Sequence, residues 1–82
     1  MNYRTFKNRK RALIKEHGCK CAYCGKQMTR RGATLDHVVP RCMGGTHDLQ
    51  NLKLACVDCN QRKADKSPHI WFAELMQPGA AA

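Results

Sequence analysis

Two Cys-x-x-Cys pairs constrain this chain more than any other feature of its sequence. The first pair is Cys21 and Cys24, the second is Cys56 and Cys59, and the whole chain has 82 residues. A chain this short buries a small core and often depends on cross-links or metal ions for stability. Two such pairs can present four thiolates to one ion, the closed tetrahedral arrangement of structural zinc. We therefore expect a zinc-stapled fold in which this ion does no chemistry.

Disulfides or free buried thiols are the alternatives to zinc. The first ten residues are charged and lack the apolar run of a secretory signal, so we expect a cytoplasmic protein, in which paired cysteines are more often metal ligands. A thiol redox role for Cys21 and Cys24 lacks the strand-helix setting of thioredoxin-like sites. Cys19 is a less regularly spaced substitute for Cys21, and Cys42 is expected to be an apolar filler or an exposed thiol.

The charge of the chain indicates a polyanionic partner. Lys and Arg number 15 against 6 Asp and Glu, and the formal net charge is +9. Nucleic acid is the usual partner of such a small basic domain, although a ribosomal-type or merely soluble basic protein shares this property. Because no stretch approaches the ~20 apolar residues of a membrane span, we expect no membrane partner.

The pattern of apolar, turn and capping residues predicts a small α+β fold in a single domain, residues 1–82. We expect a core at 19–66 flanked by an N-terminal and a C-terminal helix, with a disordered tail at 78–82. Pro40 should end the first of two short antiparallel strands, and Ser67 followed by Pro68 should open the last helix. The expected elements are helices at 3–17, 57–66 and 68–77, strands at 33–39 and 51–56, and a loop at 41–48.

The interval between the two cysteine pairs carries further chemistry. It holds 31 residues, more than the ~15 to 20 of common four-cysteine zinc motifs. The strings LDHVVP, GG, DLQNLKLAC and VDCNQRK follow one another in and after it. In order and spacing they resemble the HNH endonuclease family, over roughly the half of the chain from Cys21 to Lys63. This resemblance implies the ββα-metal (HNH) finger, here with a four-cysteine structural zinc site.

The resemblance also implies a role for four residues. His37 matches the general base, and Asn51 matches the residue that orients its imidazole. Asp36 and Asn60 match the two protein ligands of a catalytic divalent ion. Asn60 stands where the family name has histidine, as in HNN variants, and its oxygen favours Mg²⁺ or Mn²⁺ over zinc or nickel.

These residue types suit metal-dependent hydrolysis of phosphodiester bonds in DNA. Histidine titrates near neutral pH and can activate water, while a divalent ion stabilises charge on the phosphate and the leaving oxygen. The resemblance implies 5′-phosphate and 3′-hydroxyl products. Since neighbouring strand residues point to opposite faces, Asp36 and His37 need a twist or bulge between them, or a phosphate must lie between them.

Each residue also has a purely structural interpretation. Asn51 is of a type that caps turns, and Asn60 can bond to the backbone of the cysteine turn. His47 is the one rival base, though the family pattern gives it no role; His17, His47 and His69 are expected to be structural or solvent-facing. A non-catalytic zinc module that binds nucleic acid is the alternative function, but such a module does not need all four residues of the expected catalytic set.

A set of basic residues is expected to contact the DNA backbone. Lys63 lies one helical turn after Asn60 and should project toward a phosphate beside the metal. The other members of the set are Arg41, Arg30, Arg31, Arg62 and Lys53. The sequence leaves open the sequence specificity, the choice between nicking and double-strand cleavage, the oligomeric state, and whether any partners serve phage packaging, restriction or a mobile element.

Overall fold

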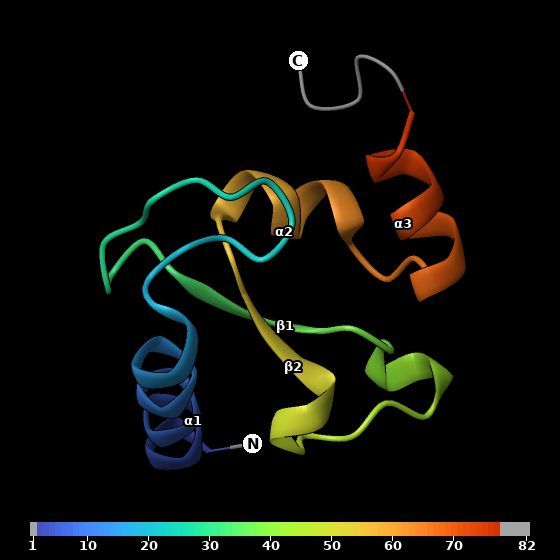
Figure 1. Ribbon diagram of the computed structural model, residues 1–82. Helices are drawn as coiled ribbons and strands as arrows, with labels where there is room; N and C mark the ends of the chain where they lie inside the picture. The colour runs from blue at the N-terminus through green and yellow to red at the C-terminus, as the bar shows by residue number, and fades with distance from the viewer. Residues whose placement is uncertain (1, 78–82) are drawn as a thin grey trace.

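A computed structural model describes residues 2–77, apart from the side chain of Tyr3. In this part of the chain three α-helices surround a two-stranded antiparallel sheet (Figure 1), which confirms the small α+β fold. The tail expected to be disordered, 78–82, lies outside the described residues. Between 2 and 77 the chain forms no helix with the length and apolarity that crossing a membrane requires.

Helix α1, Tyr3–His17, spans the expected residues. The Asn2 side chain accepts a hydrogen bond from the Thr5 amide, which satisfies one free donor of the first turn. Gly18 ends the helix at φ +80°, a conformation that favours glycine, and its amide bonds to the Ile14 carbonyl. Leu13 is buried against the sheet, so one apolar stripe docks the helix while its basic residues stay outside.

The sheet consists of β1, Thr34–His37, and β2, Leu52–Ala55. Pairing runs without interruption from Thr34 opposite Ala55 to His37 opposite Leu52, so of the expected twist or bulge there is no bulge. Figure 1 shows the strands crossing at an angle, the twist usual in a two-stranded ribbon. Both strands are shorter than expected because Pro40 turns the first away and a short 3₁₀-helix, Leu49–Asn51, precedes the second.

The two faces of the sheet belong to two clusters. Leu35, Leu52 and Leu54 pack with Leu13 of α1, while Ala55 packs with Cys21, Cys56, Cys59 and Trp71. The alternation of side chains along each strand separates the clusters. One side of the sheet is therefore apolar, and the other faces the cysteines and α2.

Helices α2, Val57–Lys63, and α3, Pro68–Leu75, cover the second side. Helix α2 ends at Lys63, three residues before the expected position 66. Ala64, with φ +48°, follows as its C-cap. Ser67 caps α3 by accepting from the Ile70 amide. Among the large apolar residues of α3, Trp71 is buried, whereas Ile70 and Phe72 are 52% and 40% exposed.

Trp71 should contribute much more to stability than its neighbour Phe72. Trp71 has no exposed surface and packs against the cysteine cluster, so we expect Trp71→Ala to cost about 3–5 kcal/mol of unfolding free energy. Phe72→Ala, in the same helix, should cost about 1 kcal/mol or less because its side chain is already partly exposed. Denaturant unfolding of the zinc-loaded proteins measures both, and equal losses would contradict this packing.

Candidate active site

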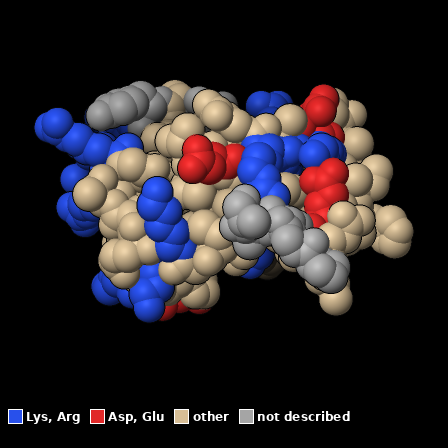
Figure 2. Space-filling view, turned by 90° about the horizontal axis from the view of Figure 1, so that it is seen from above, with Lys and Arg blue, Asp and Glu red and all other residues tan. Residues whose placement is uncertain are grey.

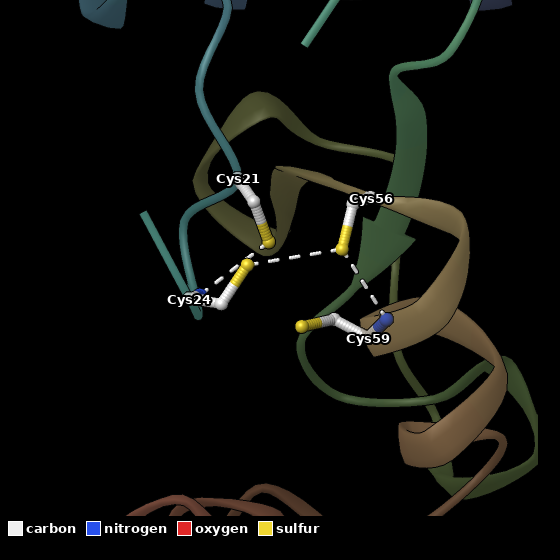
Figure 3. Close-up of side chains that lie close together, drawn as sticks. All are labelled: Cys21, Cys24, Cys56 and Cys59. Carbon is white, nitrogen blue, oxygen red and sulfur yellow. Dashed lines mark hydrogen bonds between the residues drawn. The ribbon is translucent and has the colours of Figure 1, made fainter. Parts of the chain in front are cut away.

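Four cysteines meet at the junction between the turn after α1 and the start of α2. Cys21 and Cys24 come from that turn, Cys56 caps α2, and Cys59 lies in its first turn (Figure 3). Their sulfur atoms all lie within 4.8 Å of one another, and those of Cys24 and Cys56 are 3.8 Å apart. Four sulfurs at about 2.3 Å from one zinc ion are separated by about 3.8 Å. The cluster therefore fits a structural zinc site.

Backbone N–H groups donate hydrogen bonds to two sulfurs of the cluster, which favours their anionic form. The Cys24 amide donates to the Cys21 sulfur at 3.5 Å, and the Cys59 amide donates to the Cys56 sulfur at 3.4 Å. Burial acts to raise the pKa of Cys21, but hydrogen bonds from the backbone outweigh it and lower the pKa to about 7. Burial raises the pKa of Cys59. A zinc ion would supply the positive charge that holds all four as thiolates.

The remaining cysteines stand apart from this cluster. Cys19 packs against the apolar cluster of α1, and Cys42 is exposed. All six cysteines are free thiols, so the disulfide alternative does not apply to this structure.

Asp36 is a buried carboxylate with a fixed environment. Its side chain accepts a hydrogen bond from the Tyr23 hydroxyl and lies 3.4 Å from the Lys63 ammonium. Burial, followed by the hydrogen bond and charge of Asp36, raises the pKa of Tyr23, so the phenol remains a donor. Since Tyr23 stands between Cys21 and Cys24, the cysteine turn itself orients this carboxylate.

Asn60 directly follows the last cysteine and is oriented by the sheet. Its amide nitrogen donates to the Thr34 hydroxyl at 2.8 Å, and that hydroxyl donates to the Ala55 carbonyl. This arrangement uses the nitrogen of the amide and leaves its carbonyl oxygen as the possible metal ligand.

Asp36, His37 and Asn60 line one cavity of about 330 Å³, together with Arg41 and Asp65 among others. Asp36 and His37 both line it although they are adjacent on a regular strand, and His37 is the last residue of β1. Partial burial lowers the pKa of His37 below its usual value; Arg41 and Lys63 act in the same direction, against the carboxylate of Asp36. A neutral imidazole, a carboxylate and an amide oxygen thus border one space.

His47 makes a contact that its position in the sequence does not reveal. The sequence predicts a structural or solvent-facing residue, and in the structure its Nδ1 lies 2.8 Å from Nε2 of His37. Burial, followed by the charge of Arg41, lowers the pKa of His47 as well. The nine residues between the two histidines contain no periodic pattern, so only the folded loop reveals the contact.

Asn51 holds the loop that follows β1. Its side chain accepts from the Val39 amide at 2.9 Å and donates to the carbonyls of Val39, at 3.1 Å, and Thr46, at 2.9 Å. These partners are backbone groups, so any effect of Asn51 on the imidazole of His37 passes through the loop.

The basic residues expected to contact DNA line separate hollows of the surface, except Lys63, which is buried. Lys63 is 1% exposed and donates to the His37 carbonyl at 2.8 Å, so the expected phosphate contact does not fit its position. Lys63 is buried because its positive charge balances the buried carboxylate of Asp36. Arg41 borders the cavity, whereas Lys53, Arg62 and the pair Arg30 and Arg31 line three other hollows of the surface.

Comparison with known proteins finds a matching family model and similar proteins. The family model of the HNH endonuclease matches residues 21–70. The CRISPR-associated endonuclease Cas9 of Corynebacterium diphtheriae is 39% identical over 59 residues, covering 71% of this chain and 5% of that protein. The protein of the same name from Actinomyces naeslundii is 34% identical over 55 residues, covering 66% of this chain and 5% of that protein.

A solved structure shares the fold. The crystal structure of the Type II-C Cas9 enzyme from Actinomyces naeslundii superposes with a TM-score of 0.77 at 27% identity, covering 89% of this chain and 8% of that chain. The chain therefore spans a small part, 5%, of the length of the curated relatives it matches.

Removal of zinc should unfold the protein. Ligation supplies folding free energy in a domain with so small a core, so a chelator should abolish the far-UV circular dichroism of the helices. Cys59→Ala should likewise lose zinc and structure, whereas Cys42→Ala, at an exposed position outside the cluster, should keep both. An apo protein with an unchanged spectrum would contradict the structural role of the site.

Proposed function

Since this chain belongs to the HNH endonuclease family, we propose that it hydrolyses phosphodiester bonds of DNA, with His37 as the general base. The observation that carries the proposal is the meeting of Asp36, His37 and Asn60 at one cavity. His37 would remove a proton from the attacking water, a task suited to an imidazole that burial helps to keep neutral. We further propose that residues 1–82 act as one domain with its core at 19–66.

Asp36 and Asn60 would hold the catalytic divalent ion. Both offer oxygen atoms, the donors that Mg²⁺ and Mn²⁺ prefer, and both side chains are oriented by neighbours before any ion binds. When bound, such an ion stabilises the charge that develops on the phosphate and on the leaving oxygen. Lys63 would balance the Asp36 carboxylate from the buried side. Products with 5′-phosphate and 3′-hydroxyl ends follow from the family likeness.

DNA would be held through its phosphates by separate basic surfaces. Arg41 lies at the cavity itself. Five basic residues, together with Phe6 and Ile14, line a groove of about 460 Å³ beside α1: Lys7, Lys10, Arg11, Arg30 and Arg31. In Figure 2 basic side chains project along the left edge, and further basic side chains lie beside acidic ones toward the middle and right. Contacts of this kind bind any sequence and weaken as salt rises.

Conversion of supercoiled plasmid tests the activity. We expect the parent protein with Mg²⁺ or Mn²⁺ to yield nicked or linear DNA, and no product in EDTA. His37→Ala, with its zinc content confirmed to be equal, should lose the activity because the base is gone. Absence of cleavage by the parent would favour a non-catalytic zinc module that binds nucleic acid.

Asn60→Ala should separate metal ligation from folding. We expect zinc and DNA binding to persist while cleavage falls by about 100-fold or more, because one ligand of the catalytic ion is lost. Asn60→His restores the residue of the family name and should retain activity. Gln61→Ala, at an exposed neighbouring position, is the matched control. Full activity of Asn60→Ala would remove Asn60 from the metal site.

A further inference from the structure

The imidazoles of His37 and His47 are joined by one hydrogen bond. Nε2 of His37 lies 2.8 Å from Nδ1 of His47, and the ring centroids are 5.0 Å apart at an interplanar angle of 63°. Neither histidine is among the residues expected to hold a metal ion. Two neutral rings at this distance share a single proton between the facing nitrogens, so one ring donates and the other accepts.

Only one of the two ways of sharing this proton leaves His37 able to act as a base. If His47 donates from Nδ1, Nε2 of His37 is occupied as the acceptor and its Nδ1 carries the proton. If His37 donates from Nε2, its Nδ1 keeps a free electron pair. The second arrangement is the one that a general base requires.

We propose that His47 is a positioning residue that accepts the Nε2 proton of His37 and thereby makes Nδ1 of His37 the atom that receives the proton from water. The catalytic role of His47 rests on the proposed nuclease function, but the tautomer of His37 does not. Burial, followed by the charge of Arg41, lowers the pKa of His47 and so favours the neutral ring, which can accept a hydrogen bond.

The loop that carries His47 is held against the end of β1. The Asn51 side-chain Nδ2 donates to the carbonyls of Thr46 and Val39, and the Gly45 backbone amide donates to the Pro40 carbonyl at 3.0 Å. A Cβ on Gly45 would lie 1.7 Å from the Val39 carbonyl oxygen, so only glycine allows this close approach. Asn51 therefore affects His37 indirectly, by fixing the loop that carries His47.

In the proposed hydrolysis, water is the only reactant besides the phosphodiester. One proton of the attacking water passes to Nδ1 of His37, the hydroxide forms the new P–O bond, and the bond between phosphorus and the leaving oxygen breaks. The leaving oxygen takes a proton from solvent, and His37 later releases its own to solvent. Throughout, the Nε2 proton stays between His37 and His47, so the imidazolium formed is stabilised by a neutral acceptor.

Nitrogen NMR of the zinc-loaded full chain tests the tautomer. With ¹⁵N-labelled histidine, long-range proton-nitrogen spectra report which ring nitrogen carries the proton, and His37→Ala and His47→Ala assign the signals. We expect Nε2–H on His37 in the parent, and loss of this fixed tautomer in His47→Ala but not in His69→Ala, at an exposed position. A parent with Nδ1–H on His37, or an unchanged tautomer in His47→Ala, overturns the proposal.

Plasmid cleavage by the same variants tests the catalytic consequence. Loss of an orienting partner costs about 10- to 100-fold in comparable sites, so we expect His47→Ala to lower kcat by about that factor with little change in KM. His47→Gln, whose carbonyl oxygen can accept the Nε2 proton, should recover part of the loss. An unchanged kcat in His47→Ala overturns the positioning role. If the tautomer is as expected but the parent does not cleave, the histidine pairing stands and the nuclease function fails.

Discussion

The four-cysteine site is the constraint on which the rest of the structure depends. Cys24 and Cys56 are separated by 31 residues, and this segment contains the sheet and the loop between its strands. Closing it with a metal ion removes much of the freedom that the unfolded chain would have. The same closure places the candidate catalytic residues, because Tyr23 lies inside the first cysteine pair and Asn60 follows the second. The four-cysteine site and the candidate active site therefore share neighbouring residues.

Buried charge explains the layout of the side of the sheet that faces α2. Asp36 is 4% exposed and Lys63 is 1% exposed, and either group alone would be costly to remove from water. Together with the Tyr23 hydroxyl they form a set of satisfied partners from the cysteine turn, β1 and α2. This arrangement holds the carboxylate ready at the cavity, and we infer that an incoming divalent ion would meet an oriented ligand rather than a flexible one.

Local signals in the sequence predicted most of the fold. Asn2, Gly18 and Ser67 with Pro68 mark helix ends through contacts within a few residues, so α1 and the start of α3 agree with expectation. The cysteine spacing indicated each half of the zinc cluster for the same reason, since the two cysteines of a pair are three residues apart. What the sequence did not reveal depends on contacts between distant segments. The burial of Lys63 and the approach of His47 to His37 arise only when the loop and α2 fold against β1.

A crystal structure of the zinc-loaded protein soaked in Mn²⁺ tests the account most directly, because anomalous scattering distinguishes the two metals. We predict zinc bound by the sulfurs of Cys21, Cys24, Cys56 and Cys59, and manganese bound by oxygens of Asp36 and Asn60 in the cavity beside His37. Manganese bound elsewhere, or cysteines joined as disulfides, would contradict the claim that one zinc staple builds the fold and positions the catalytic metal site.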